Sequence, residues 1–388
     1  MIDEKKNTTK QINTLTSKII KVEVIPIKMP LKQVFKGSNY FMSHRVTVIT
    51  RITTEDGIVG EIYNGDELDD LQAIVNMIKN EMAPLIIGEN IFDVKHIWQK
   101  LYPITFNILA DRKISLNALS CVDSAIYDAI GKTLGMPLVQ LWGGSKTKLP
   151  VMLIGGYYSE RSDVDEVKIK NDIETYKEMG VAACKFKVGG KSPEIDIERV
   201  RIAREAAGDE FVLTVDANQG WDRKDALTFA QGIRDFDIRW FEEPCRWSYA
   251  KDAMKDIRLM SGIPVAAGQS EDSPAECIEM MKGGAIDVCN FDASWSGGPT
   301  AWKQAASTAE ALGFDMAHHE EPQISAHLLG STMSGTFLEV FHPDRDPMFY
   351  EIIENRNEFK NGYYKIPEGP GFGIQLDKRV IESYRLDK

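Results

Sequence analysis

Two lysines, Lys185 and Lys187, close an apolar stretch at residues 182–188 and are followed by Gly189-Gly190. An apolar run that ends in a glycine turn predicts a strand, and side chains alternate between the two faces of a strand. Both ammonium groups are therefore expected on the same face. Two like charges on a largely buried strand are costly unless an anion or a reaction uses them. A solvated lysine pair is the alternative for this strand taken alone, but the residues downstream argue against it.

Polar residues also close the apolar stretches that follow. They are acids, amides and histidines at or just after predicted strands: Asp216 and Asn218, Glu242, Gln269 and Glu271, Asp292, His318 and His319, and Glu339. Alternation directs His318 to the face opposite His319, which predicts a packing role for His318.

Oxygen ligands on three consecutive predicted strands suit a hard cation, with Mg²⁺ ahead of Ca²⁺ and Mn²⁺. The ligands are Asp216, Glu242 and either Gln269 or Glu271. Any one of these acids alone would more simply cap a helix or pair with an arginine. Their combination with the lysine pair before them and the histidine after them favours a single metal-dependent site.

The elements that position these residues begin after Lys148, where short apolar runs alternate with helical patterns. This rhythm predicts an α/β fold with a parallel (β/α) barrel, and the carboxyl ends of barrel strands form the active-site face. An open doubly wound sheet is the competing architecture, but its G-x-G-x-x-G fingerprint is missing from the first strand–helix turn. The strands are expected at 150–154, 182–188, 212–216, 239–242, 265–267, 285–292, 314–318 and 336–340, with helices at 167–179, 192–207, 223–235, 274–282, 300–312 and 324–329.

The amino-terminal part has a different pattern. Alternating apolar residues predict antiparallel strands at 19–31, 45–53 and 58–63, with a long polar loop at 32–44, and residues 67–130 are mainly helical. We therefore expect a flexible tail at 1–18, an α+β unit at 19–145, the barrel at 146–341, and a segment at 342–388 that returns to the first unit.

Composition limits the partners. The net charge of −12, from 46 Lys and Arg against 58 Asp and Glu, argues against nucleic acid or an anionic membrane as the main partner. A small acidic substrate stays compatible with the local lysine pair. There is no membrane-length apolar run and no recognisable signal peptide, and the five cysteines are scattered without CxxC spacing, which together predict a reducing cytoplasm.

These residues together resemble the enolase superfamily, and most closely its mandelate racemase subgroup. The similarity runs from about residue 19 to past Glu339, and includes residues 57–61, 125–132 and 141–144. The resemblance implies a modified TIM barrel with an α+β capping domain that the carboxyl-terminal segment completes. It also implies a Mg²⁺ cofactor, a small carboxylate substrate and assembly into a homo-oligomer.

The resemblance further implies roles for single residues. Lys187 would be the catalytic base, with Lys185 against it, and Glu339 the acid of the last strand. Asp292 and His319 would form the family's His-Asp dyad, and Asp216 and Glu242 would bind the metal, with Asn218 beside the first. The third ligand is normally a Glu directly after the strand-five Gly, and here that position holds Gln269, so either Gln269 or Glu271 completes the set.

The implied reaction removes the proton α to a carboxylate, through a metal-stabilised enediolate. We expect a dehydratase of an acid sugar, an aldonate or aldarate, that gives a 2-keto-3-deoxy acid. A racemase or epimerase of a 2-hydroxy acid is the alternative; a lactonising enzyme and a non-catalytic metal- and carboxylate-binding protein are more distant ones. Substrate contacts are expected from Lys185, Asn218, Tyr157, Tyr158, Lys36 and Trp295. His327, on a predicted helix, is expected to be structural.

Overall fold

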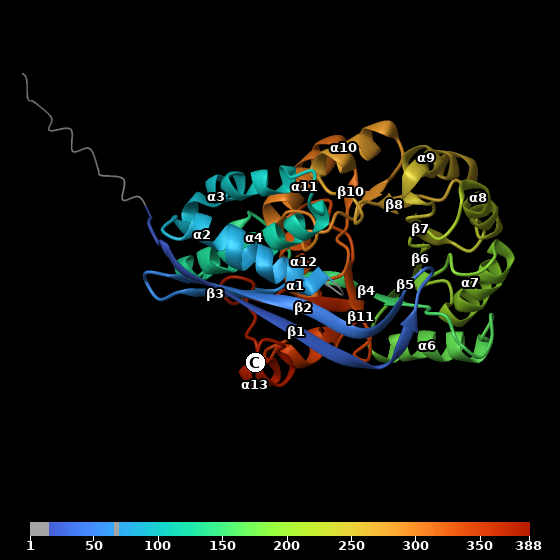
Figure 1. The fold of residues 1–388 in the computed structure, drawn as a ribbon. Coiled ribbons are helices and arrows are strands. Elements are labelled where there is room, and N and C mark those ends of the chain that lie inside the picture. The colour runs from blue at the N-terminus through green and yellow to red at the C-terminus, as the bar shows by residue number, and fades with distance from the viewer. Residues whose placement is uncertain (1–14, 66–69) are drawn as a thin grey trace, which may run out of the picture.

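The amino-terminal unit is an antiparallel sheet covered by helices. In the computed structural model, which describes residues 15–65 and 70–388, the sheet order is β1 (Ile19–Lys36), β2 (Phe41–Thr54) and β3 (Val59–Tyr63). Figure 1 shows the long β1–β2 hairpin reaching from this unit across to the strands of the second unit. Most of the tail expected at 1–18 lies outside the described residues.

The prediction of a long polar loop at 32–44 is wrong. β1 continues to Lys36 and β2 begins at Phe41, so only the residues between them form the turn. The pairing register shifts between Pro30 and Phe35, and the residues inserted there are exposed or half-buried. Such a bulge keeps the strands paired while polar side chains face solvent, which hides the strand from a pattern of alternation.

Helices pack on this sheet, and α4 is the longest of them. Gly60 on β3 permits the contact, because a Cβ there would lie 2.2 Å from the Ala125 carbonyl oxygen of α4. The helical segments of this unit are α1 (Leu71–Met77), α2 (Ala83–Ile86), α3 (Val94–Leu101), α4 (Arg112–Leu134) and α5 (Leu138–Leu141).

The second unit is the α/β barrel. Parallel strands follow the order β10-β9-β8-β7-β6-β5-β4, with β11 beside β4, and Met316 of β10 bridges to Gly335 just before β11. Figure 1 shows the helices packed around the outside of these strands. The strands are β4 (Lys148–Gly155), β5 (Ala183–Lys187), β6 (Val212–Asp216), β7 (Ile238–Glu242), β8 (Val265–Ala267), β9 (Val288–Cys289), β10 (Asp315–Met316) and β11 (Leu338–Phe341).

The barrel helices match the expected ranges, with one addition. α9 (Ala250–Ser261) was not among the expected helices, and its buried face consists of only Ala253, Met254 and Ile257. The others are α6 (Glu166–Glu178), α7 (Pro193–Ala207), α8 (Arg223–Gly232), α10 (Pro274–Gly283), α11 (Gly298–Leu312) and α12 (Pro322–Gly330). None of the helices in the described ranges combines the length and apolar character needed to cross a membrane.

Inward-facing side chains change character along the barrel strands. Ala183 and Trp240 belong to an apolar cluster, whereas Lys185 and Glu242, two positions further along the same strands, are buried and charged. Because alternate residues share a strand face, the apolar cluster is the floor beneath the charged strand ends. The cluster consists of Met152, Ala183, Trp240, Ala266, Val288 and Ala317.

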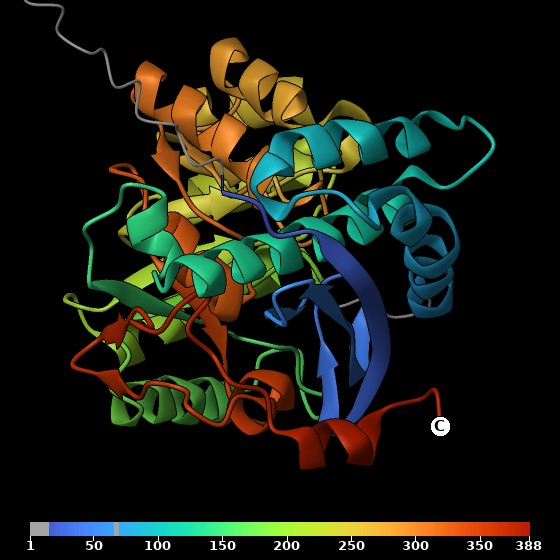
Figure 2. The ribbon, with the colours of Figure 1, turned by 90° about the vertical axis from the view of Figure 1, so that its left-hand side faces the viewer.

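The carboxyl-terminal segment contacts both units. β12 (Phe359–Lys360) and β13 (Tyr363–Lys365) form a hairpin that pairs with the start of β4. α13 (Lys378–Tyr384) then lies against β1, where the Leu386 amide donates to the Pro26 carbonyl at 3.0 Å. Figure 2 shows α13 beneath the amino-terminal sheet.

Candidate active site

The predicted lysine pair meets the predicted acids at the carboxyl ends of β5, β6 and β7. The pairing register places Lys187 beside Asp216 and Asp216 beside Glu242. The Lys187 ammonium lies 2.7 Å from Asp216 Oδ2 and 2.8 Å from Asn218 Oδ1. The Lys185 ammonium lies 2.7 Å from both Glu242 Oε1 and Glu339 Oε1. All these side chains except Asn218 are buried.

Burial and the neighbouring charges shift the pKa values of the side chains in this cluster. Burial raises the pKa of Glu242 to about 8, although Lys185 opposes the change. Burial favours the neutral amine of Lys187, but the Asp216 carboxylate outweighs it and holds the pKa of Lys187 well above its ordinary value. In this arrangement Lys187 is an ammonium group paired with Asp216.

The residues fit a divalent cation. Asp216, Glu242 and Glu339 place three buried carboxyl groups around two lysines, and the negative charges of Asp216 and Glu339 add to the effect of burial on the pKa of Glu242. No group of three His, Cys, Asp or Glu side chains within the described ranges is arranged to hold a metal ion. Asp216 and Glu242 offer carboxylate oxygens and Gln269 offers an amide oxygen, and oxygen ligands are those that Mg²⁺ prefers.

Gln269 and Glu271 face different spaces. Gln269 lines the central cavity, where its Nε2 donates to Glu243 Oε2 at 3.0 Å and its Oε1 accepts from Asn290 Nδ2 at 3.2 Å. Glu271 lines a neighbouring cavity, together with Trp247 of the loop after β7, and burial raises the pKa of Glu271 to about 7. Of the two candidates for the third ligand, the geometry favours Gln269.

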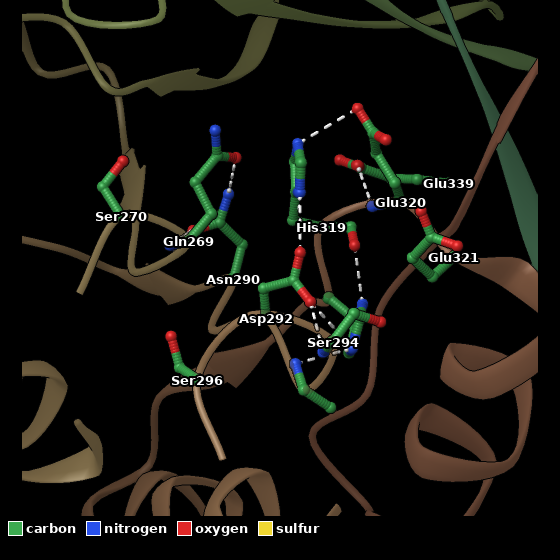
Figure 3. A network of polar contacts seen from close by, with 12 residues as sticks. Gln269, Ser270, Asn290, Asp292, Ser294, Ser296, His319, Glu320, Glu321 and Glu339 are labelled. Atoms are coloured by element: carbon green, nitrogen blue, oxygen red, sulfur yellow. Dashed lines mark hydrogen bonds and ion pairs between the residues drawn. The ribbon is translucent and has the colours of Figure 1, made fainter. Parts of the chain in front are cut away.

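The expected dyad is formed across β9 and β10. His319 Nδ1 lies 2.9 Å from Asp292 Oδ2, and the Ser294 amide donates to the other Asp292 oxygen at 2.6 Å. Figure 3 shows His319 between two carboxylates. The second belongs to Glu320, whose Oε1 lies 3.2 Å from His319 Nε2. Burial lowers the pKa of His319, but Glu320 and Asp292 outweigh it and raise the value well above the ordinary one.

The two other histidines of this region have the structural roles expected of them. His318 is fully buried; its Nδ1 donates to the His319 carbonyl, and its Nε2 accepts from the Ala293 amide at 3.0 Å. His327 on α12 accepts from the Val139 amide and donates to the Phe372 carbonyl, both at 3.0 Å.

A cavity of about 290 Å³ is lined by Lys187 of the lysine pair and by His319 of the dyad. Lys187 reaches it from the end of β5 and His319 from the residues after β10, and the sheet order separates those strands by β4 and β11 on one side and β6 to β9 on the other. Asn218 and Trp295 line the cavity as expected, and the Trp295 ring lies 4.8 Å from that of His319. The remaining lining residues are Tyr40, Met42, Gln219, Glu243, Gln269, Ser270, Glu320 and Arg345.

Three expected substrate contacts do not line this cavity. The Tyr158 hydroxyl is bonded to Asp196 at 2.7 Å and accepts from the Gly190 amide, which makes it a structural group. Lys36 pairs with Glu160 at 2.7 Å in a wider outer cavity of about 840 Å³ beside the hairpin turn. Tyr157 is buried against Phe35, with ring centroids 5.2 Å apart.

Sequence reasoning missed several lining residues, including Glu243 and Glu320. Each directly follows a residue that had been assigned to the site, and alternation would send it to the opposite face. However, Glu243 has φ 39° and Glu320 has φ 51°, so the backbone leaves the extended conformation at both positions. His319 and Glu320 then both line the cavity, and Glu243 lines it directly after Glu242. The paired acids Glu242-Glu243 and Glu320-Glu321 were the available signal.

Comparison with known proteins agrees with this geometry. Residues 19–143 match the mandelate racemase / muconate lactonizing enzyme amino-terminal domain, and residues 168–380 match the enolase C-terminal domain-like family. The chain is 30% identical to arabinonate dehydratase of Saccharolobus solfataricus, over 87% of this chain and 90% of that protein. It is 25% identical to N-succinyl-L-Arg/Lys racemase of Bacillus cereus, over 94% of this chain and 97% of that protein.

Solved structures show the same fold. A mandelate racemase/muconate lactonizing enzyme from a marine actinobacterium, in complex with magnesium, is 45% identical and superposes with a TM-score of 0.89. The alignment covers 96% of this chain and 100% of the other. With both domains matched and the lysine pair, acids and histidine dyad gathered at one barrel mouth, the chain belongs to the mandelate racemase / muconate lactonizing enzyme family of the enolase superfamily.

Proposed function

We propose that the protein is a Mg²⁺-dependent dehydratase of an acid sugar, an aldonate or an aldarate. The observation that carries the proposal is a single cavity that receives a lysine from one strand end and, from another, a histidine whose two ring nitrogens each lie against a carboxylate. Dehydration needs both a base for the α-proton and an acid for the departing hydroxyl. The arabinonate dehydratase of Saccharolobus solfataricus, a relative over most of its length, supports this substrate class.

The proton balance assigns a role to each group. Lys187, as the free amine, takes the proton from the carbon next to the carboxylate. His319 donates its Nε2 proton to the hydroxyl of the following carbon; the C–O bond breaks and water leaves. The enol that remains becomes a 2-keto-3-deoxy acid. Mg²⁺ held by Asp216, Glu242 and Gln269 would stabilise the negative charge that the substrate carboxylate gathers, and would compete with Lys187 for Asp216.

The other cavity residues fit a hydroxylated substrate. Asn218, Gln219, Gln269 and Ser270 present amide and hydroxyl groups, which bind sugar hydroxyls by neutral hydrogen bonds. We assign Lys185, which pairs with Glu242 and Glu339, to the side of the site that would hold the substrate carboxylate.

A racemase or epimerase of a 2-hydroxy acid is the second candidate. The same Lys187 and His319 approach the cavity from different strands, which is the arrangement that removal of a proton from one face and return to the other requires. The similarity to an N-succinyl-amino acid racemase supports this alternative.

An NMR screen in D₂O with Mg²⁺ separates the two candidates. The panel contains aldonates, aldarates and 2-hydroxy acids, and both keto-acid signals and the α-proton are followed. We expect a keto acid from one sugar acid, lost in Lys187→Met and kept in Lys191→Met, since Lys191 pairs with Asp163 in the outer cavity. Inversion or α-proton loss without a keto acid would favour the racemase. Silence across the panel, with no Mg²⁺ binding by calorimetry, would refute both.

A further inference from the structure

Glu320 contacts Nε2 of His319, the nitrogen whose proton the proposed reaction donates to the leaving hydroxyl. Its Oε1 is 3.2 Å from His319 Nε2, while Asp292 Oδ2 is 2.9 Å from Nδ1 (Figure 3). We propose that Glu320 is a positioning residue that holds the His319 imidazole protonated on both nitrogens until substrate arrives. The proposal rests on the proposed role of His319 as the acid.

The hydrogen-bond chemistry supports this assignment. An ionised carboxylate only accepts hydrogen bonds, so two carboxylates on one imidazole require N–H on both of its nitrogens. Charge-assisted hydrogen bonds of this kind are about twice as strong as neutral ones. Asp292 alone would fix the ring orientation and leave Nε2 free to act as either acid or base. With Glu320 as its partner, Nε2 carries a proton and can act as the acid.

The backbone is held in an uncommon conformation to place this carboxylate. Glu320 and Glu321 both have φ 51°, a left-handed region that non-glycine residues rarely adopt. Consecutive residues of this kind persist only where the surroundings fix them. Here the Glu320 amide donates to Glu339 Oε2 at 2.9 Å, and Glu321 accepts from Arg45 Nη2 at 2.6 Å and from Gln323 at 2.7 Å.

Glu320 already has a second partner. Arg45 of β2 lies 3.3 Å from Glu320 Oε2, the oxygen that does not contact His319. The hydroxyl of a bound substrate can therefore take the place of Oε1 at His319 Nε2 without leaving the Glu320 carboxylate unpaired. Burial raises the pKa of Glu320, but His319 and Arg45 outweigh it and hold the value well below the ordinary one, so Glu320 stays charged.

The groups around His319 come from several elements. On its own segment are His318 and Glu320; the loop after β9 supplies Asp292, and the loop after β7 supplies Glu243, which His319 influences. Charged groups that act on Glu320 or share the cavity with it are Arg45, Arg345, Glu321, Glu339 and Lys187. Of these carboxylates, Glu320 is the one that contacts Nε2, so its removal should have a distinct effect.

The test is the titration of His319 by ¹⁵N NMR in the Mg²⁺-loaded full chain without substrate, with the signal assigned from His319→Gln. Glu320→Gln should lower the pKa of His319 by about one unit or more, a tenfold or larger loss of proton affinity. Glu321→Gln is the matched control, because it removes the neighbouring carboxylate from the same arginine without touching His319. It should leave the His319 pKa within a few tenths of a unit.

Equal shifts in both variants, or no shift in Glu320→Gln, would overturn the proposal. If Glu320→Gln does not fold, Glu320→Asp replaces it: the shorter side chain keeps the charge but withdraws it from Nε2, and should give an intermediate shift. This titration requires no turnover, so its failure is separate from failure of the dehydratase proposal. With a substrate in hand, the alkaline limb of the rate profile should move to lower pH in Glu320→Gln alone.

Discussion

Gln269 supplies an amide to the proposed metal site, where the two neighbouring strands each supply a carboxylate. Asp216 and Glu242 end adjacent strands as acids, whereas the next strand presents an amide that is bonded to Glu243 and Asn290. A neutral ligand lowers the charge attraction for Mg²⁺ but avoids a third buried carboxylate when no metal is bound. Affinity for hard cations depends on the number of charged ligands.

Gln269→Glu should therefore bind Mg²⁺ more tightly, by roughly tenfold, when measured by calorimetry. The same variant should unfold at a lower temperature without the metal, because the new carboxylate would face Glu243 Oε2, now 3.0 Å from the amide nitrogen. Glu271→Gln is the control and should leave Mg²⁺ affinity unchanged, because Glu271 faces the neighbouring cavity. Affinity that falls in Glu271→Gln would instead make Glu271 the third ligand.

At the scale of the elements, the β1–β2 hairpin carries Tyr40 to the barrel mouth. Tyr40 follows β1 in the tight turn and lines the cavity, with its ring centre 5.8 Å from the Lys187 ammonium. Gly37 makes the close turn feasible, since a Cβ there would lie 2.2 Å from the Tyr40 ring.

Gly37→Ala should displace the Tyr40 ring and open the cavity at this side. We expect kcat/KM on the substrate found in the screen to fall by about tenfold or more, since small displacements in a closed site are costly. Ser38→Ala, in the same turn, should be close to wild type, because the Ser38 hydroxyl has no hydrogen-bond partner. Steady-state kinetics would refute the role of Tyr40 if both variants behaved alike.

The sequence located the barrel strands because each apolar run ends at a polar residue and a turn, but the strands expected at 285–292 and 314–318 are shorter in the structure, at Val288–Cys289 and Asp315–Met316. Lys187, Asp216, Glu242 and Asp292 were found in this way, each at or just after a strand end. Sequence reasoning failed where the backbone leaves the extended conformation, as at Glu320, since alternation then no longer predicts the face.

Contacts between segments far apart in the chain could not be predicted from the sequence either. Arg45 comes from the first unit and meets Glu320 and Glu321 of the barrel, 275 and 276 residues away in the chain. No local pattern predicts such a pair.

At the scale of the whole molecule, His327 joins three segments. It lies on α12, accepts from Val139 of α5 and donates to the Phe372 carbonyl of the carboxyl-terminal segment. Burial lowers the pKa of His327 to about 4, so the folded protein keeps this side chain neutral where the unfolded chain protonates it. The unfolded state then binds more protons between pH 4 and about 6.5, and the free energy of unfolding falls as the pH is lowered through that range.

His327→Gln should remove this component of acid sensitivity. A glutamine can accept and donate at the same two places but does not titrate. The wild type should lose up to about 3 kcal/mol more than the variant between pH 7 and pH 4, measured by urea unfolding at each pH. Parallel pH dependence in the two proteins would mean that other groups dominate and that His327 is not a titrating part of this junction.

The assignment of Lys187 as the base and His319 as the acid is tested most directly by deuterium exchange in His319→Asn. With Mg²⁺ and the substrate in D₂O, the Asn variant should still exchange the α-proton, because Lys187 remains, but should release no keto acid, because the acid for the leaving hydroxyl is gone. Lys187→Met should do neither. Exchange that survives in Lys187→Met and disappears in His319→Asn would contradict the assignment and make His319 the base.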